Sequence, residues 1–304
     1  QFIILLSKYC KIDSNQYYKD KLVHTVEFLK KNFLNEEGFL GSAYDADSDG
    51  EEGKYYVYTY NEIKDIENID KYFEIKPEGN WENKIILIEK EKPKERIIKE
   101  LLQIRLKKNK PFFDEKTQLD LNCLWISCLV SANDILPQNR YLNLAEEFFS
   151  KIEKKYLNKD IYHSYSKETV FIEDYAFLIN ASNDLYDKTM NFKYKDFARR
   201  LAIEAMDKFF LNEKNIFQKN PKNNKDVFFR PIDISDNTIP NGNAIMLINF
   251  IRLGMIEEAK KLSYSLNGYL NVYKSHMMTS LKAIDYFNNT TSGKNCNHQG
   301  CVID

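Results

Sequence analysis

Polar and ionisable residues recur at the points where apolar helical segments of this 304-residue sequence begin. Carbohydrate chemistry uses such residues, because paired carboxyl groups cleave glycosidic bonds and a general base near neutral pKa epimerises or isomerises sugars. We therefore expect a set of candidate residues near one end of the helices. They form three groups: Asp114, Lys116 and Asn122; Glu173, Asp174 and Tyr175; Asp236, Asn241 and Asn243.

Within these groups, Asp114, Glu173 and Asp174 are the candidate acids and bases. Lys116, together with the asparagines at 122, 241 and 243, is assigned to substrate binding, and Tyr175 offers a ring that would stack on a sugar. A structural alternative stays open for Asp174 and for the asparagines at 122 and 243, since these residue types also cap helix N-termini.

His163 is the candidate histidine. The chain has four histidines, and His163 alone falls in a turn at the expected end, within Tyr162-His163-Ser164-Tyr165. Histidine is the usual general base near neutral pH. Epimerases of the usual kind use two, so an exposed turn histidine without a catalytic role is the alternative interpretation.

An acidic turn follows the first amphipathic helix. Tyr44, Asp45 and Asp47 open the run Tyr-Asp-Ala-Asp-Ser-Asp-Gly, which copies the first half of a calcium-binding loop. The twelfth position of such a loop is Tyr56, where a bidentate glutamate is needed. An acidic turn held by backbone amides and a sugar-binding loop are the two alternatives to a calcium site, and we assign Tyr44, Asp45 and Asp47 to substrate binding. The sequence predicts no metal and no cofactor.

The elements that position these residues repeat along the chain. Amphipathic helices with one apolar stripe end in similar turns at residues 33–39, 156–162 and 210–216, and segments that are apolar almost all round cover 122–136, 174–185 and 243–253. Helices apolar on most faces are buried, whereas one-stripe helices lie half exposed. The pattern predicts four helical pairs, at about 1–45, 118–165, 172–218 and 240–275.

An inner ring of buried helices inside an outer ring of amphipathic ones is an all-α toroid. We predict an (α/α)6 barrel, incomplete at its N-terminal side because the sequence begins inside an apolar periodic segment. Short strands are expected near 39–43, 55–59, 85–88 and 161–165. An open helical solenoid is the alternative, because it uses the same hairpins.

Residues 1–304 are expected to form part of a single barrel domain, with an insertion at about 54–111. Within it, Thr59 and Glu62 have the spacing of a capping box, which predicts the start of a helix. Residues 90–110 hold nine Lys or Arg against three Glu. We interpret them as the solvated face of a helix that packs through Ile97, Leu101 and Ile104.

Charge and hydropathy narrow the class of protein. Lys and Arg number 44 and Asp and Glu 45, for a net charge of −1, which argues against a nucleic-acid partner. No apolar run reaches the 18 residues of a membrane span, and no signal-peptide pattern frames Phe2 to Leu6. The five cysteines suit a reducing compartment, so we expect a cytoplasmic protein.

Several blocks, in the same order, give the chain a resemblance to a known family. The run from Gly41 to Tyr58 resembles the signature of the spermatogenesis-associated, thioredoxin-domain-containing family. Other blocks resemble further family motifs: Pro77 to Lys84, Asp114 to Lys116 with Asn122, Phe171 to Ala176, Pro240 to Asn243, and the pair Cys296 and Cys301. Two motifs depart from the family, because Leu121-Asn122-Cys123 stands for Trp-Asn-Gly and Glu115 for the second Asp of Asp-Asp-Lys.

The resemblance implies an upstream thioredoxin-like domain, absent from this sequence, and an (α/α)6 barrel akin to sugar epimerases and six-hairpin glycosidases. The family's own activity is poorly defined, so the resemblance implies a fold more firmly than a reaction. We expect a carbohydrate-related barrel of epimerase, isomerase or glycosidase type that acts on a small-molecule sugar. The alternative is a non-catalytic module that binds a ligand or client and is attached to a redox-active thioredoxin-like domain.

Parallel inner helices bring their N-termini to one end of a barrel. Outer helices run back, so the turns after them return to the same end. We therefore expect the candidate residues of several segments to converge on one mouth of the ring: Asp45, Asp47, Asp114, Lys116, Glu173, Asp174 and Tyr175.

Overall fold

The computed structural model describes residues 1–136, 140–157, 160–164, 169–224 and 228–291, and the backbone of 296–297 and 300–301. It divides into two compact units. The first comprises Gln1–Leu40 and Lys116–Asp304, and the second comprises Gly41–Glu115. The position of one unit relative to the other is not determined, so each is described by itself.

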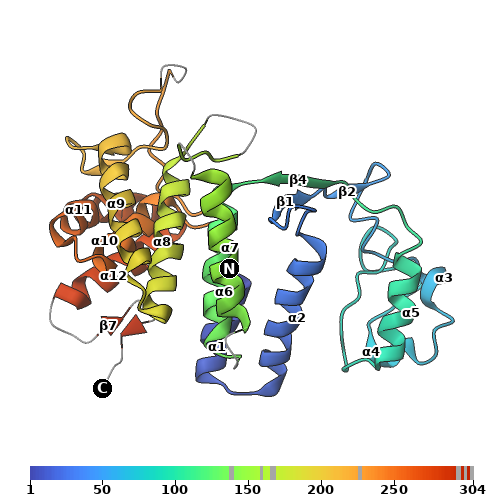
Figure 1. Cartoon of the computed structure of the whole chain (residues 1–304). Helices are drawn as coiled ribbons and strands as arrows, with labels where there is room; N and C mark the ends of the chain where they lie inside the picture. The colour runs from blue at the N-terminus through green and yellow to red at the C-terminus, as the bar shows by residue number, and fades with distance from the viewer. Residues whose placement is uncertain are drawn as a thin grey trace. The chain divides into compact units, whose positions relative to one another are not determined.

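Antiparallel helical pairs make up the first unit (Figure 1). The pairs are α1 (Phe2–Ile12) with α2 (Gln16–Asn32), α6 (Leu119–Asn133) with α7 (Arg140–Tyr156), α8 (Ile172–Thr189) with α9 (Phe192–Phe209), and α10 (Gly242–Arg252) with α11 (Ile256–Tyr273). A 3-10 turn, η1 (Lys274–Met277), then leads into α12 (Met278–Thr291). The four predicted pairs are thus present. No helix among the described residues is long and apolar enough to cross a membrane.

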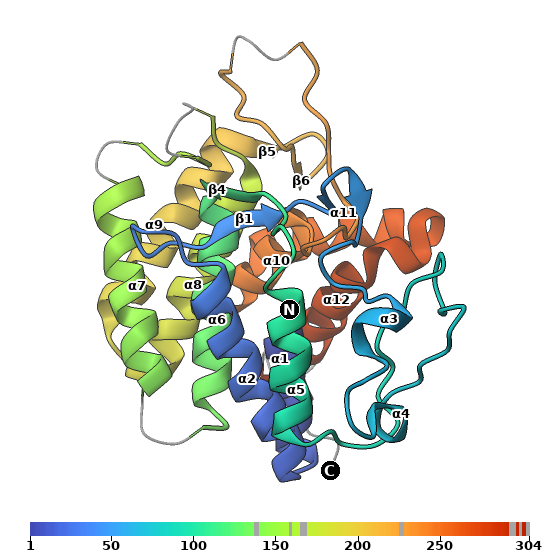
Figure 2. The same cartoon turned by 90° about the vertical axis from the view of Figure 1, so that its right-hand side faces the viewer.

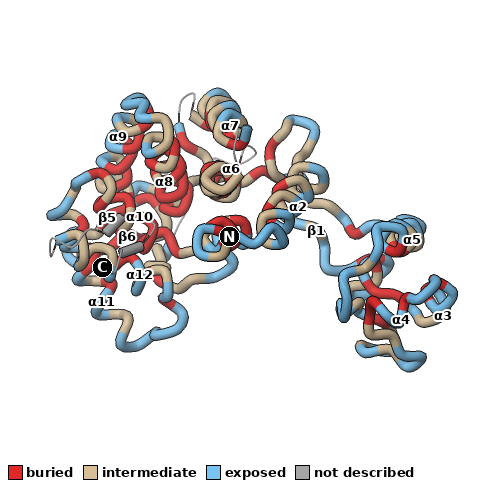
Figure 3. Tube along the Cα trace, turned by 90° about the horizontal axis from the view of Figure 1, so that it is seen from below, coloured by how far each residue is buried: buried red, intermediate tan, exposed pale blue. Residues whose placement is uncertain are grey.

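The two kinds of helix differ in burial, as their sequences predict. On α7 the buried side chains form one stripe, which includes Tyr141, Ala145, Phe148 and Ile152, and the opposite face is charged. The first turns and the middle of α8 and α10 are buried nearly all round (Figure 3). Burial of apolar surface on the inner helices is the main favourable term for such a fold.

The inner helices lie side by side in the order α1, α6, α8, α10 and α12 (Figure 2). Their N-termini share one end of the unit, as contacts between neighbouring starts show. The Gln1 side chain donates to Thr238 O just before α10, and a side-chain atom of Ile172 would lie 3.0 Å from a Cβ added at Gly242. The Asp236 carboxylate accepts from Asn241 N at 3.1 Å and Thr279 N at 2.8 Å, which joins the starts of α10 and α12.

The other end of these helices is joined by ion pairs. Asp134, at the end of α6, contacts Lys11 of α1 at 2.7 Å and Lys188 of α8 at 2.5 Å. Arg252, at the end of α10, contacts Asp184 and Asp187 of α8, both at 2.8 Å. The side chains of Asp134, Asp184 and Arg252 are mostly buried, so these pairs tie adjacent inner helices together.

Strands are short and lie partly where the sequence predicts them. In the first unit, β5 (Phe210–Leu211) pairs with β6 (Ile216–Phe217), and the backbone of β7 (Cys296–Asn297) pairs with β8 (Gly300–Cys301). At the predicted strand 161–165, only Ser164 pairs, with Gln118, and Tyr165 lies outside the described residues.

The second unit has a core of its own, made by side chains that include Tyr58, Ile63, Ile85, Ile97 and Leu101. It contains β1 (Gly41–Tyr44), β2 (Asp47–Ser48), β3 (Glu51–Glu52), α3 (Tyr60–Ile63), α4 (Ile69–Tyr72), α5 (Glu95–Arg105) and β4 (Phe113–Thr117), of which β1 pairs with β4 and β2 with β3. The predicted insertion at 54–111 falls inside this unit. That the whole chain belongs to one barrel domain stays a prediction.

Two sequence expectations for this unit are confirmed and one is wrong. The Thr59–Glu62 capping box is present at α3, and Ile97 and Leu101 are buried on α5. The predicted strands at 55–59 and 85–88 are reduced to a single bridge between Tyr58 and Ile85. These two side chains are buried in the core, whereas Ile86 and Ile88 are exposed, so packing rather than an extended ladder holds the segment.

Candidate functional site

Three ionisable side chains meet at the N-terminal end of the inner helices. Asp120 comes from the first turn of α6, His163 from the segment after α7, and Asp174 from the first turn of α8. His163 Nδ1 lies 2.9 Å from Asp174 Oδ1 and 4.0 Å from Asp120 Oδ1. Two of the four residues predicted to be catalytic, His163 and Asp174, are therefore brought into direct contact.

The hydrogen bonds around this cluster hold each group in place. Asp174 Oδ2 accepts from Phe171 N at 2.8 Å, which satisfies a backbone donor at the start of α8. Asp120 Oδ1 accepts from Leu121 N at 2.7 Å, and His163 Nε2 lies 3.1 Å from the Gln118 side-chain amide. The backbone adds a further bond, since Leu119 N donates to His163 O. Asp174 therefore caps its helix and orients His163 at the same time.

Burial shifts the pKa values of the ionisable groups in the cluster. Burial and the neighbouring Asp174 carboxylate raise the pKa of Asp120 to about 6, and burial also raises the pKa of Asp174. Burial by itself would lower the pKa of His163, but the hydrogen bond and charge of Asp174 outweigh it and the pKa is raised. Asp174 has no exposed surface, so it can act on a sugar outside the cluster only through His163.

Glu173, the neighbour of Asp174 in the first turn of α8, is a second unusual carboxyl group. Its side chain is buried, and Oε2 has no hydrogen-bond partner within the described part of the chain. Burial, aided by the charges of Asp174 and Asp233 and opposed by Lys219, raises the pKa of Glu173 to about 7. Glu173 Oε1 would lie 3.3 Å from a Cβ added at Gly242, so the carboxyl group lies against the start of α10.

Near the starts of α6 and α10, the returning segment is held by a buried asparagine instead. Asn122 accepts from Leu40 N at 2.9 Å and donates to Leu40 O at 3.1 Å. Asn243 accepts from Phe217 N at 2.9 Å and donates to Phe217 O at 3.0 Å. We call this arrangement the amide bridge: a buried asparagine of an inner helix holds the backbone of the segment returning from an outer helix.

At α8 the amide bridge is replaced by ionisable groups. The segment returning from α7 is held through the His163 side chain by Asp174 rather than through its backbone by an asparagine. A backbone segment can be held by an uncharged amide, as α6 and α10 do. The change to a carboxylate and an imidazole therefore marks α8 as chemically different from its neighbours.

Asn241 and Tyr175 have contacts within the protein. Asn241 caps α10 by accepting from Ala244 N at 2.9 Å. The Tyr175 hydroxyl donates to Glu204 at 2.5 Å and lies 3.0 Å from Lys208 Nζ, on the side of α9. The Tyr175 ring has no exposed surface. A buried ring cannot stack on a sugar, so this placement argues against the role that the sequence suggests.

The remaining candidates lie in the second unit or at its boundary. Tyr44 stacks on Phe113 with ring centroids 4.7 Å apart, and Asp45 Oδ1 accepts from Asp47 N at 3.0 Å. Asp114 and Lys116 lie on β4, with the boundary between the two units at residues 115 and 116. Because the units are not placed relative to one another, convergence of these residues on the His163 end stays a prediction.

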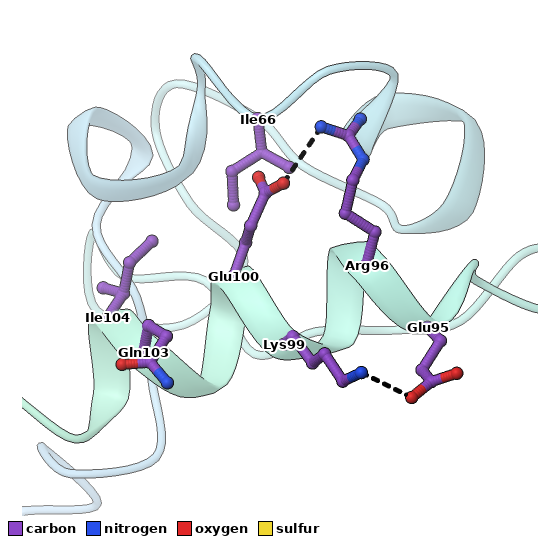
Figure 4. Close-up of a pocket in the computed structure, with 7 residues that line it drawn as sticks. All are labelled: Ile66, Glu95, Arg96, Lys99, Glu100, Gln103 and Ile104. Carbon is purple, nitrogen blue, oxygen red and sulfur yellow. Dashed lines mark ion pairs between the residues drawn. The ribbon is translucent and has the colours of Figure 1, made fainter.

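A pocket of about 590 Å³ lies on one face of α5 in the second unit (Figure 4). Ile66 and Ile104 line it together with charged residues of the helix. Those charges pair along the helix, Arg96 with Glu100 at 3.0 Å and Lys99 with Glu95 at 2.7 Å. None of the residues predicted to be catalytic lines this pocket, and its paired charges offer no group for proton transfer.

Sequence reasoning missed Asp120. A signal for it exists, because Asp120 follows Leu119 as Glu173 follows Ile172, each an acidic second residue of an otherwise apolar inner helix. Aligning the helical pairs would have placed Asp120 beside Glu173 in the repeat. Its proximity to His163 depends on packing between segments and has no counterpart in local sequence.

Comparison with known proteins agrees with the family resemblance. The chain is 21% identical over 319 aligned residues to human spermatogenesis-associated protein 20, covering 83% of this chain and 40% of that protein. It is 30% identical over 177 residues to the uncharacterized protein B0495.5 of Caenorhabditis elegans, covering 54% of this chain and 24% of that protein. The chain thus spans less than half the length of these relatives. No protein-family profile matches it.

Among solved structures, a sugar epimerase from a ruminal bacterium is similar with a TM-score of 0.53 and 13% sequence identity. The match covers 97% of this chain and 75% of that one. It confirms the predicted α/α barrel class. The chain is a distant homologue of spermatogenesis-associated protein 20, which confirms the resemblance at the level of the family.

Proposed function

We propose that this member of the spermatogenesis-associated protein family is a carbohydrate-active barrel of epimerase or isomerase type, with Glu173 as its proton-transferring group. The observation that carries the proposal is the replacement of the amide bridge at α8 by ionisable groups. Asp174 and His163 occupy the place of an asparagine and a backbone, beside a glutamate whose Oε2 has no hydrogen-bond partner among the described residues.

In the proposed reaction Glu173 removes a proton from a sugar carbon next to a carbonyl group. In an isomerisation Glu173 returns it on the same face to the neighbouring carbon, and in an epimerisation a second acid, protonated His163, delivers a proton to the other face. A buried carboxyl group with a free oxygen suits this role, because no internal hydrogen bond has to break before it meets a substrate. In its protonated form His163, held by Asp174, would favour the developing oxyanion of the sugar. Asp174 is a positioning residue.

The test is hydrogen exchange between sugar and solvent. The chain is incubated in D₂O with free hexoses and N-acylhexosamines, and ¹H NMR follows loss of the signal at the carbon beside the carbonyl group. We expect exchange above the protein-free rate with at least one sugar, and at least a hundredfold loss in Glu173→Gln. Glu153→Gln, at a partly buried glutamate of α7 paired with Lys193, is the matched control.

Exchange that is absent with every sugar, or that survives in Glu173→Gln, would refute the assignment. Release of the chromophore from aryl glycosides, again sensitive to Glu173→Gln, would instead support the glycosidase type.

A second candidate is a binding module without turnover, attached in a longer protein to a redox-active thioredoxin-like domain. The observation that favours it is that the polar atoms of His163 and Asp174 already form hydrogen bonds within the protein. Both ring nitrogens of His163 and both oxygens of Asp174 have partners within the protein. This candidate predicts that a sugar raises the thermal midpoint of the chain without any exchange, and that Glu173→Gln retains this effect.

A further inference from the structure

We propose that Asp120, His163 and Asp174 form a binding site for a divalent transition metal ion, with Zn²⁺ as the best match. Each residue offers one ligand atom, and these atoms all lie within 4.8 Å of one another. The inference does not depend on sugar turnover, because it concerns a property of the protein that can be measured without any sugar.

The distances in the cluster suit a tetrahedral ion. Zn²⁺ binds imidazole nitrogen and carboxylate oxygen at about 2.0–2.2 Å, so two ligand atoms of a tetrahedral site lie about 3.4 Å apart. The His163 Nδ1 separations from Asp174 and Asp120, 2.9 and 4.0 Å, lie on either side of that value. Binding of the ion would therefore open the shorter edge and close the longer one, each by about 0.5 Å.

The acidic groups of the cluster also favour a bound cation. Two carboxyl groups and one imidazole are packed together, with side chains 10%, 0% and 15% exposed for Asp120, Asp174 and His163. Burial favours the protonated forms of these carboxyl groups, so a cation bound between them would be needed to keep both ionised. A divalent ion would neutralise the carboxylates, and the imidazole favours a transition metal over Ca²⁺ or Mg²⁺.

Outer partners are in place for the proposed ligands. A metal-binding histidine usually donates its second ring N–H to a fixed acceptor. With Nδ1 on the metal, Nε2 would be that donor. The Gln118 side-chain amide nitrogen lies 3.1 Å from Nε2, so a flip of the amide would present its oxygen as the acceptor. Asp174 Oδ2 and Asp120 Oδ1 each accept a backbone N–H, from Phe171 and Leu121.

The comparison between helical pairs is an independent argument. At α6 and α10 an uncharged amide bridge holds the returning segment by two or more hydrogen bonds. At those two junctions the returning segment only has to be held in place, and an asparagine does this without burying a charge. At α8 the same junction buries ionisable groups from three segments, which is costly unless a ligand compensates them.

The test measures metal binding directly. Chain stripped with a chelator is titrated with Zn²⁺, and content is measured by mass spectrometry after removal of free ion. We expect about one equivalent per chain and a rise in thermal midpoint. Co²⁺ should give visible d–d bands without the intense near-ultraviolet absorption of thiolate ligands. Thiolate absorption would instead show that the ion is bound by Cys296 and Cys301. We expect no such absorption, and we expect a Cys296→Ser, Cys301→Ser double variant to retain the ion.

Variants locate the ion. His163→Gln and, as a milder second change, Asp120→Asn should each weaken Zn²⁺ binding at least tenfold, while His24→Gln on the exposed side of α2 should leave it unchanged. Retention of the equivalent in a folded Asp120→Asn variant, or no binding by the parent chain, would overturn the proposal. Loss of sugar exchange with intact Zn²⁺ binding would refute the proposed function alone.

Discussion

Replacement of Asn243 by alanine separates a structural role from a binding role at the start of α10. The Asn243 side chain has no exposed surface and makes three hydrogen bonds to backbone. It accepts from Phe217 N at 2.9 Å and donates to Phe217 O at 3.0 Å and Asp233 O at 2.9 Å. Every polar atom of the amide is used to hold β6 and the following loop against the helix.

The expected loss in free energy of unfolding follows from the buried backbone groups that Asn243→Ala leaves without a partner. Asn243→Ala strands the Phe217 N–H and C=O in a buried place at about 1–3 kcal/mol per group, and this cost takes the place of the ordinary net worth of those hydrogen bonds. Asp233 is half-buried, so water can reach its carbonyl oxygen. Alanine has a higher helix propensity than asparagine, which offsets about 0.6 kcal/mol of this loss. We therefore expect the free energy of unfolding to fall by about 3 kcal/mol.

The assay uses the two tryptophans, one in each unit. In a Trp81→Phe background, fluorescence of the buried Trp125 on α6 reports unfolding of the first unit alone during urea denaturation. Asn212→Ala is the control, because Asn212 is exposed in the turn of the same β5–β6 hairpin. Its midpoint should stay within about 0.5 kcal/mol of the parent, as for other surface changes.

An Asn243→Ala protein as stable as the Asn212→Ala control would refute this reasoning. If such a protein also lost sugar binding, the substrate-binding role suggested by the sequence would stand. A large loss of stability would identify the amide bridge as the reason for asparagine at this position.

Three further predictions concern other junctions. Arg252→Met leaves the two aspartates of α8 without their buried partner, so the free energy of unfolding should fall by about 3 kcal/mol. Urea denaturation measures this loss, and the exposed Arg199→Met is the control, for which we expect almost no change. Burial opposes ionisation of Asp134, but the lysines of α1 and α8 outweigh it and lower its pKa, so its stabilising effect is present above the ordinary carboxyl pKa and lost as pH falls through the lowered one. Thermal melts should thus show Asp134→Asn less stable than the parent at pH 7, with the difference shrinking as pH falls below the ordinary carboxyl pKa. In the second unit, Thr59→Ala removes half of the capping box and should cost about 1 kcal/mol, seen as faster amide exchange across α3, with Thr59→Ser as the neutral control.

The helical pairs were predictable because their signal is local. The apolar stripe on α7 and the nearly continuous apolar surface of α8 each report how many faces of a helix meet other protein. The capping box at Thr59 is equally local, since the partners are three residues apart. Short strands were harder, because one bridge between Tyr58 and Ile85 depends on residues 27 positions apart sharing a core.

The candidate site was predictable only in part. Glu173 and Asp174 attract attention because charged residues open an otherwise apolar helix, and His163 because it falls in a turn at the same end. Asp120 follows the same rule and was missed, and the buried ring of Tyr175 was expected to face a ligand. Whether a first-turn side chain points toward a returning segment or toward the neighbouring helix depends on how the helices are rotated against one another.

From the sequence by itself follow the inner and outer helices, the repeat that pairs them, and the end of the barrel at which polar residues gather. These properties depend on spacing along the chain, where hydrophobic periodicity and capping act over a few residues. Only the tertiary structure decided that Asn122 and Asn243 hold backbone while Asp174 holds His163, with Asp120 4.0 Å from the same imidazole. Such contacts join residues 11 to 82 positions apart, so they arise from packing of whole helical pairs, which no local pattern encodes.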